Sequence, residues 1–332
     1  MFTSVLDLIK DAQHIVVVQA ENPDGDSLGS SLALEELLSD AGKDVTLYCA
    51  IDIPKYMQYI QGWDRVEKDW PKKADMAIIV DTSSKALLTK ALTTPGVTHF
   101  FESHPTIIID HHQSEEGDLP FDTTKLIIPT AVATGEILYN LAIEAGWSIN
   151  PQAAENLFIS VQADSLGLTT QNTSAESYRV AAELVALGAV PSIIEGRRRE
   201  YMKKPADILA YKGRLIERVE YFLDGKLATV HIPWAEIEEF SDRYNPSVLV
   251  LDEMRLVDTV QIAVAIKSYP DGKATGKIRA NIPIGNTVAG YFGGGGHEYA
   301  SGFKIYEKYD TLISELVNAV DKALTDYESA IS

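Results

Sequence analysis

Short apolar runs alternate with helix-like stretches through the first half of the chain. The runs are rich in valine and isoleucine and hold few charges, which is typical of parallel strands buried on both faces. Between the first two runs, residues 27–41 place leucines on one side and stop at Gly42, as an amphipathic helix does. We therefore predict an α/β domain whose parallel sheet has helices on both faces, with strands over residues 14–20, 44–50, 76–81 and 106–110.

The pattern changes after Pro129, where helical periodicity dominates over residues 130–145, 151–166 and 174–187. A charged stretch before Pro205 then separates the two halves of the chain. The second half alternates strands and helices again, with strands expected over 227–232, 260–267, 275–282 and 301–306 and a final helix over 309–328. We predict a metal-binding domain over 1–190, a linker helix over 191–212, and a smaller α/β domain over 213–332 that binds substrate, with a cleft between the domains.

Composition narrows the class of protein. A chain of 332 residues with 45% hydrophobic positions can bury two cores, and no apolar run approaches the roughly 20 residues of a membrane span. The single cysteine, Cys49, excludes an internal disulfide and favours a cytoplasmic location. The net charge of −19 argues against a groove for long duplex nucleic acid. The net charge does not exclude small anionic substrates, because a metal ion or a few arginines can reverse the negative electrostatic potential locally.

Acidic and imidazole side chains follow three of the predicted strands. Asp24 and Asp26 come after the first strand, Asp81 closes the third, and Asp110 with His111 and His112 closes the fourth. Ligands bind beyond the carboxyl ends of parallel strands, and carboxylate with imidazole suits Mn²⁺, Mg²⁺, Fe²⁺ or Zn²⁺. Taken singly, each aspartate before Ser or Thr also fits a helix cap. Three clusters together favour a metal site, because so many carboxylates repel one another without a cation.

The motifs resemble those of the DHH phosphoesterase family, named for an Asp-His-His triplet. NPDGDSLGS (22–30), IIVDTS (78–83) and IIIDHHQS (107–114) are similar to its first three motifs, and Asp164 stands where a fourth acidic residue is placed on a helix. FGGGGHEYASG (292–302) is similar to the signature of the DHH-associated C-terminal domain. The five motifs keep the family's order over nearly the whole chain.

That resemblance implies two divalent ions, commonly Mn²⁺, with Mg²⁺ as the alternative. Asp24 and Asp81 would hold one ion, and the other would be held by Asp26, Asp81, His111 and Asp164. His112 would lie beside the attacked phosphate, and we group it with Asp81 and Asp110 as the catalytic set. The substrate would be bound in the second domain by Arg279, Gly293, Gly294, Gly295, Gly296 and His297.

One position departs from the family pattern. The family has a histidine four residues before the first aspartate of its first motif, and this chain has Ala20 there. Alanine cannot bind a metal, so we expect the first ion to bind weakly or to arrive with substrate. Strand alternation would point the side chains of Gln19 and Glu21 away from the side that Ala20 faces.

Two polar segments have several interpretations on their own. Four glycines in a row fit a linker, a tight turn or a backbone cradle for an anion, and they lack the Lys and Ser/Thr of a P-loop. The run Arg197–Arg199 fits a solvated helix face, with attraction of an anionic substrate as the alternative.

We predict a phosphoric ester hydrolase, of exonuclease or pAp phosphatase type, in which a metal-activated water cleaves short oligoribonucleotides or small nucleotides such as pAp or pApA to mononucleotides. One alternative is a nucleotide-binding regulator weakened by Ala20. The other is a pyrophosphatase or polyphosphatase, whose C-terminal domain lacks GGGGH. The partners expected are a small nucleotide or short single-stranded RNA, with neither long duplex nor membrane, and the resemblance allows a homodimer. The choice among pAp, pApA, short RNA and cyclic dinucleotides stays open.

Overall fold

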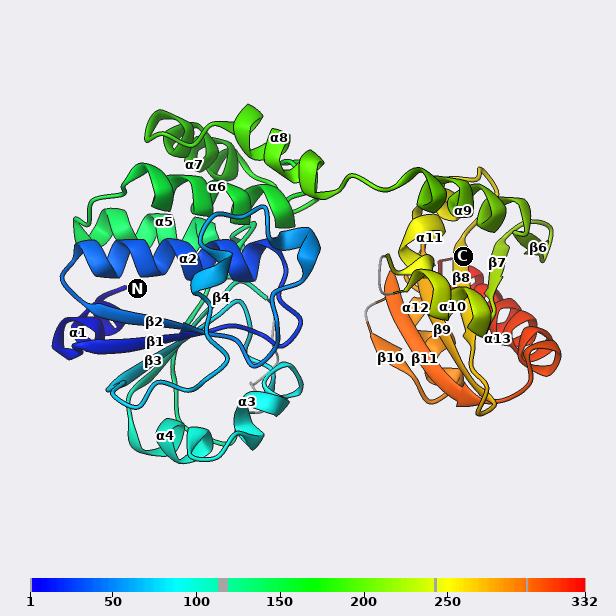
Figure 1. The fold of residues 1–332 in the computed structure, drawn as a ribbon, viewed down its shortest axis with the longest axis horizontal. Coiled ribbons are helices and arrows are strands. Elements are labelled where there is room, and N and C mark those ends of the chain that lie inside the picture. The colour runs from blue at the N-terminus through cyan, green and yellow to red at the C-terminus, as the bar shows by residue number, and fades with distance from the viewer. Residues whose placement is uncertain (1, 113–118, 242–243, 297, 332) are drawn as a thin grey trace. The chain divides into compact units, whose positions relative to one another are not determined.

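The chain divides into two compact units, Met1–Lys203 and Lys204–Ser332 (Figure 1). The structure, a computed structural model, describes residues 2–112, 119–241, 244–296 and 298–331. The division falls inside the segment 191–212 that we predicted as a single linker helix. That segment holds α8 (Pro191–Tyr201) and the start of α9 (Ala206–Glu217). The helix breaks because Pro205 has no N–H to donate and disfavours helical backbone in the residue before it.

A parallel sheet forms the centre of the first unit. Its strands lie in the order β2-β1-β3-β4-β5, and every neighbouring pair is parallel. The predicted parallel sheet and its four strands are confirmed, while β5 was not predicted because only Leu126 in it is fully buried. The bounds are β1 (His14–Val18), β2 (Asp44–Tyr48), β3 (Met76–Val80), β4 (Thr106–Asp110) and β5 (Thr124–Ile127).

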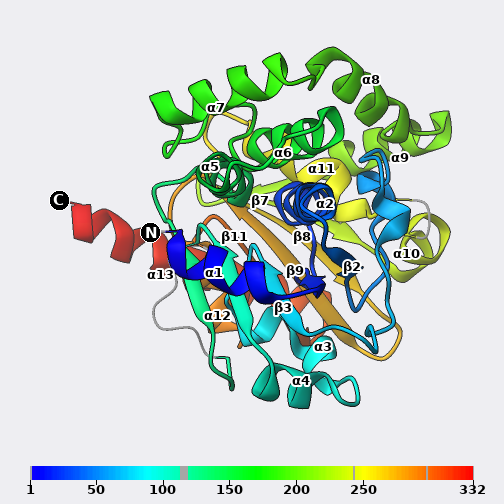
Figure 2. The same cartoon turned by 90° about the vertical axis from the view of Figure 1, so that its left-hand side faces the viewer.

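Helices cover both faces of this sheet, as alternating strand residues require (Figures 1 and 2). One face, with Ile15 and Val17 of β1, packs against α2, α5 and α6, and α7 and α8 lie outside them. The other face, with Val16 and Val18, packs against α3 and α4. The helices are α1 (Thr3–Asp11), α2 (Gly25–Asp40), α3 (Thr89–Thr93), α4 (Val97–Ser103), α5 (Thr134–Ala145), α6 (Pro151–Asp164) and α7 (Ala175–Ala186), with 3₁₀ turns η1 (Lys55–Met57), η2 (Trp63–Arg65) and η3 (Lys85–Leu87).

Helices α2 and α6 approach closely because small residues face each other. A Cβ added at Gly25 would lie 2.5 Å from the Cβ of Ala163, and one at Gly29 would lie 2.7 Å from the carbonyl oxygen of Asn156. The helices could not come this near with larger side chains. This contact places the start of α2 beside the end of α6.

We expect Gly29→Ala to lower the free energy of unfolding by about 1–3 kcal/mol, because its methyl group would overlap the backbone of α6. Gly196→Ala is the matched control, since Gly196 lies in helix α8 and an added Cβ there meets nothing within 4 Å. That variant should gain about 0.5–1 kcal/mol from the higher helix propensity of alanine. Chemical denaturation of both variants checks the pair, and a loss of equal size in both would contradict the packing argument.

The second unit holds a mixed six-stranded sheet in the order β10-β11-β9-β8-β7-β6. The pair β7–β8 is parallel and the other pairs are antiparallel. The predicted smaller α/β unit and its four strands are confirmed, and β6 and β10 are short additions. The strands are β6 (Glu220–Phe222), β7 (Leu227–Ile232), β8 (Ile262–Ser268), β9 (Lys273–Ala280), β10 (Gly295–Gly296) and β11 (Ala300–Tyr306).

Each face of this second sheet also has its own helices. Helices α12 (Gly285–Tyr291) and α13 (Tyr309–Ile331) pack on the face of Ile262, Val264 and Ile266. Helices α9, α10 (Trp234–Phe240) and α11 (Pro246–Arg255) pack on the opposite face, over Ala263 and Ala265. Adjacent residues of β8 therefore belong to different cores.

Within the described residues, no individual helix combines the length and the apolar character that crossing a membrane requires. Only α7 and α8 pass that test as a pair, and they meet at a bend of 92°.

Candidate metal centre

Acidic and imidazole groups from four segments meet at the carboxyl edge of the first sheet. Asp26 lies in the first turn of α2, Asp81 follows β3, and His111 follows β4. Asp164 is the last residue of α6, which the glycine contact holds against α2. The ligand atoms fall into two groups, within each of which all atoms lie within 4.8 Å of one another: Asp26, His111 and Asp164, and Asp81, His111 and His112.

The carboxylate of Asp26 is fully buried and accepts four hydrogen bonds. Ser30 Oγ donates over 2.8 Å and Ser160 Oγ over 2.5 Å. The backbone N–H groups of Thr134 and Gly135, at the start of α5, donate over 2.8 and 3.4 Å. These N–H groups have no partner inside their own helix and carry its partial positive charge. The start of α5 therefore holds the carboxylate of Asp26 in one orientation.

Asp24 caps helix α2, as the capping alternative predicted. Its carboxylate accepts from the backbone N–H groups of Asp26 and Ser27, each over 3.0 Å. Loss of water around this carboxyl raises the pKa of Asp24 to about 6, with the nearby charges of Asp164 and Asp26 adding to the effect. A cap and a metal ligand are compatible, because a carboxylate has free lone pairs beyond those two bonds.

Asp81 does not cap a helix, so the capping alternative was wrong at this position. Its backbone has a φ of 61°, which is uncommon outside glycine. Its carboxylate is 6% exposed and accepts from Thr134 Oγ1 over 3.2 Å. Burial first, and then repulsion from Asp26, Asp24, Asp164 and Asp110, raise the pKa of Asp81 well above its ordinary value. A non-glycine residue held at positive φ beside other carboxylates indicates a functional constraint.

His111 faces the carboxylates with its outer ring nitrogen. Its Nδ1 lies 3.3 Å from the carbonyl oxygen of Ala131, so Nε2 is left toward the site. Nε2 lies 3.0 Å from Asp164 Oδ2, 3.5 Å from Asp26 Oδ2 and 3.7 Å from Asp81 Oδ1. It is nevertheless buried without a well-formed hydrogen bond among the described residues. A buried nitrogen aimed between three carboxylates fits a cation better than it fits a hydrogen-bond network.

The pKa of His111 also reflects the surrounding negative charge. Burial lowers it, but the contact with Asp164 and the charge of Asp26 outweigh burial and raise the pKa to about 9. The cluster without metal therefore keeps protons that a divalent cation would displace on binding. The donor set of carboxylate oxygens with one imidazole fits a divalent cation.

Asp110 orients His112 and is not directed at the other acids. Its Oδ1 accepts from the backbone N–H of His112 over 3.0 Å and lies 2.8 Å from the ring Nδ1. Burial would raise the pKa of Asp110, but these bonds and both imidazoles outweigh burial and lower it. With Nδ1 turned to Asp110, Nε2 of the half-exposed His112 is free to meet a ligand.

Ala20 is buried two residues after the end of β1, and its described neighbours Gln19 and Glu21 offer no replacement ligand. The carboxylate of Glu21 accepts from the backbone N–H groups of Lys90 and Ala91 and so caps α3. Gln19 is 1% exposed, and its amide atoms make no hydrogen bond within the described part of the chain. Neither of these two neighbours therefore takes the place of the missing imidazole.

The predicted substrate-binding residues lie in the second unit. Arg279 is on β9 and donates from one guanidinium nitrogen to the carbonyl oxygen of Ile278 over 3.0 Å. Gly293 has a φ of 70° and Gly296 a φ of 132°. A Cβ on Gly294 would lie 2.3 Å from the carbonyl oxygen of Gly302, so glycine is required for this close approach. Gly295 and Gly296 form β10, and the predicted residue His297 lies outside the described residues.

The arginine run in α8 is ion-paired within the first unit. Arg197 pairs with Glu155, and Arg198 and Arg199 both pair with Glu195. This arrangement favours the helix-face interpretation over attraction of substrate.

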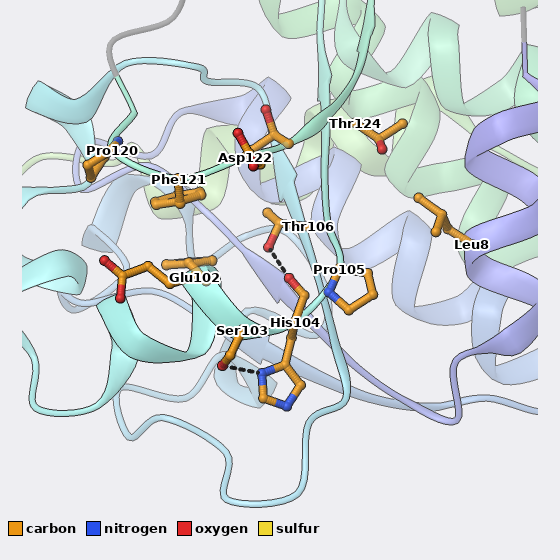
Figure 3. A pocket seen from close by; sticks show the side chains of 12 residues that line it. Leu8, Glu102, Ser103, His104, Pro105, Thr106, Pro120, Phe121, Asp122 and Thr124 are labelled. Carbon is orange, nitrogen blue, oxygen red and sulfur yellow. Dashed lines mark hydrogen bonds between the residues drawn. The ribbon is translucent and has the colours of Figure 1, made fainter.

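Two pockets of the first unit differ in their relation to the acidic cluster. One of about 600 Å³ lies at the amino ends of β4 and β5, where His104, Pro105 and Phe121 line it (Figure 3). It is at the opposite edge of the sheet and holds none of the grouped ligands. Another of about 510 Å³ is lined by Gly25 and Ala163, which are sequence neighbours of the acids, and by Tyr56, Tyr59 and Arg198.

Sequence reasoning missed the residues that support the acids. Thr134 and Ser160 donate to Asp81 and Asp26, and both come from helices that follow the sheet in sequence. Ser30 gave a usable signal, because it stands one helical turn after Asp26. Nothing local distinguishes Thr134 from an ordinary residue of a helix start.

Known proteins match the chain in sequence and in fold. Residues 14–161 match the DHH family, N-terminal domain. The chain is 24% identical to a probable bifunctional oligoribonuclease and PAP phosphatase NrnA of Streptococcus mutans, over 96% of this chain and 98% of that protein. It is 22% identical to the bifunctional oligoribonuclease and PAP phosphatase NrnA of Bacillus subtilis, over 95% and 97%.

A solved structure shares the fold. An exopolyphosphatase-related protein from Bacteroides fragilis superposes with a TM-score of 0.84 at 21% sequence identity, covering 99% of this chain and 96% of that one. The family match ends three residues before Asp164, so Asp164 and the second unit lie outside it.

Proposed function

We propose, from the premise that this chain belongs to the DHH family, that it is a metal-dependent phosphoric ester hydrolase of short oligoribonucleotides and small nucleotides. The observation that carries the proposal is the orientation of His111 Nε2 between the carboxylates of Asp26, Asp81 and Asp164. The relatives in Streptococcus mutans and Bacillus subtilis, which match over nearly their full length, support the substrate class.

The proposed ligand set is the one that the family resemblance implies. Asp26, Asp81, His111 and Asp164 would hold one divalent ion, and Asp24 with Asp81 would hold the other. Two ions sharing a carboxylate lower the pKa of a water molecule and neutralise charge at phosphorus, and Mn²⁺ is the ion we propose. Asp81 suits the shared position because a carboxylate from each proposed set, Asp26 from one and Asp24 from the other, lies close enough to repel it.

The other predicted residues would act on the substrate. Asp110 holds His112 through Nδ1, and the exposed side of the ring would donate a hydrogen bond to the departing oxygen. Arg279 would contact a phosphate group, as a planar guanidinium does in bidentate fashion. The backbone of Gly293–Gly296 would approach the nucleotide closely, and we retain His297 as a proposed contact.

The lost imidazole at Ala20 gives a direct prediction about metal binding. We expect Ala20→His to lower the Mn²⁺ concentration for half-saturation about ten-fold, because an added imidazole would complete the coordination of the weaker ion. Ala20 is buried, so the larger side chain should also cost about 1–3 kcal/mol of stability.

Calorimetric titration with Mn²⁺ checks this change independently of turnover. Ala20→Gln is the control, because it adds comparable bulk with a weaker ligand. Equal gains in both variants, or no gain in either, would contradict a missing imidazole at this position.

A substrate panel tests the proposed activity. Purified protein with Mn²⁺ should release mononucleotide or phosphate from pAp, pApA and a labelled short oligoribonucleotide, with cyclic di-AMP and pyrophosphate included for comparison. If no substrate in the panel is hydrolysed but nucleotide still binds, a regulator would be favoured over an enzyme. Preference for pyrophosphate would favour the pyrophosphatase alternative, against which the GGGGH segment argues.

The proposed enzyme is cytoplasmic, acts on small or single-stranded substrates, and forms a homodimer. The net charge of −19 supports small or single-stranded substrates over long duplexes. Cys49 is buried and free, which supports a cytoplasmic location. A homodimer would be detected by light scattering of the purified protein.

A further inference from the structure

Three cationic side chains share one face of the second unit's sheet. Residues in register on neighbouring strands point to the same side, and Lys277 and Arg279 of β9 pair with Ala265 and Ala263 of β8. Lys267 stands two residues after Ala265 on β8, so it points to that side as well. Lys277 and Arg279 are roughly 7 Å apart along their strand, and Lys267 lies diagonally across from Lys277 at about 7–8 Å.

None of these three cations forms an ion pair among the described residues. Lys267 donates to the amide oxygen of Asn245, Arg279 donates to a backbone carbonyl, and Lys277 makes no hydrogen bond that the structure records. The carboxylate that acts on Lys277 is that of Asp252, an exposed residue of α11, and it lies beyond ion-pair distance.

Three other cations of the same unit have close acidic partners. Lys212 pairs with Glu253, Arg218 with Glu236 and Lys226 with Glu328, at 2.6–2.8 Å. Acidic residues outnumber basic ones 48 to 29 in this chain, yet the structure records no carboxylate within ion-pair distance of these three neighbouring cations among the described residues.

The three side chains are also partly withdrawn from water. Burial first, and then repulsion from Lys277, lowers the pKa of Lys267; burial and then Arg279 lower the pKa of Lys277. Crowding like charges in this way costs stability, which an anionic ligand would restore. On the neighbouring strand β11, small residues stand in register with two of these cations: Ala300 with Arg279 and Gly302 with Lys277.

We propose that Lys267 and Lys277 join Arg279 in a phosphate-binding face on the second unit's sheet. The chemical class of its ligand is a phosphate group of a phosphorylated nucleotide. The identification of that nucleotide as the substrate rests on the proposed function, whereas the anion site itself does not. The two lysines would contact phosphate directly and so favour ligands with more than one phosphate over ligands with one.

Equilibrium binding of pAp to the full chain tests the site, with EDTA present so that no metal contributes. Each lysine–phosphate contact is a charge-assisted hydrogen bond, so we expect Lys267→Ala/Lys277→Ala to raise the dissociation constant about ten-fold or more. Adenosine 5′-monophosphate should lose less affinity than pAp in the same variant. Lys212→Ala/Lys226→Ala removes the same charge from paired positions and should bind as the wild type does.

Unchanged binding in the Lys267/Lys277 variant, with a loss in Arg279→Ala, would overturn the proposal by assigning the site to the arginine alone. An equal loss in both double-lysine variants would overturn it as well, since net charge would then explain the effect. Phosphate release with Mn²⁺ is measured separately. Absence of hydrolysis with pAp binding intact would refute the proposed function and leave the anion site standing.

Discussion

Asp81→Asn is expected to lower phosphate release at least about a thousand-fold while the metal-free protein becomes more stable. The loss of activity follows because one side chain serves both proposed ions, and their charge stabilisation contributes several kcal/mol. Asparagine keeps the size of the side chain and tolerates the φ of 61° better than alanine does. The asparagine variant therefore separates loss of charge from backbone strain.

The gain in stability follows from the electrostatics of the site in the metal-free protein. Burial and four neighbouring carboxylates raise the pKa of Asp81, so its ionised form weakens the folded state. The neutral amide removes that penalty, and we expect about 1 kcal/mol of added stability in EDTA. Below the ordinary carboxyl pKa of 3.8 the variant and the wild type should agree. The difference should grow as the pH rises above 3.8, because the unfolded chain then loses a proton that folded Asp81 keeps, and it should level off above the raised pKa of Asp81.

Denaturant unfolding in EDTA and Mn²⁺ calorimetry measure the two effects separately. Asp44→Ala is the control, because it removes an exposed carboxylate from the amino end of the same sheet. Wild-type turnover by Asp81→Asn would eliminate the shared-carboxylate arrangement. A stability loss in EDTA would show that the hydrogen bond from Thr134 outweighs the repulsion.

The strands that matter most could be predicted because burial on both faces leaves continuous apolar runs. In β3, all five residues of Met76–Val80 are buried, and no polar position interrupts the pattern. In β5 only Leu126 is fully buried, and β10 is two glycines, so neither has an apolar run to detect. Edge strands without an apolar run escape sequence reasoning for this physical reason, whereas the edge strand β2 was predicted.

The acids could be predicted from their position after the strands, but their supports could not. Asp26 and Asp81 follow buried strands, and this position makes them recognisable in the sequence. Thr134 and Ser160 each stand more than fifty residues after the aspartate to which they donate. Their roles depend on the close packing of α2 with α6 and on where α5 begins, which are tertiary facts. The positive φ of Asp81 likewise has no signature in the residues around it.

Asp26→Asn should have the opposite effect on stability from Asp81→Asn, although both should abolish activity. The carboxylate of Asp26 accepts two hydroxyl groups and two backbone N–H groups in a fully buried setting. An asparagine turns one acceptor into a donor, so at least one buried donor loses its partner. We expect a loss of about 3 kcal/mol in EDTA, because bonds to a buried charge are strong and an unpaired buried group is costly.

The comparison of these two aspartates separates two roles that one site combines. The folded chain itself binds the carboxylate of Asp26, through the start of α5 and two serines. This carboxylate therefore stabilises the fold without a cation. The carboxylate of Asp81 accepts one hydrogen bond from a hydroxyl group and is repelled by the neighbouring carboxylates. Its negative charge therefore needs a cation to be stabilised. Measured together in EDTA, the two variants should move the denaturation midpoint in opposite directions. If both moved it the same way, the carboxylates would be equivalent, and the division into a structural anion and a metal-dependent one would be wrong.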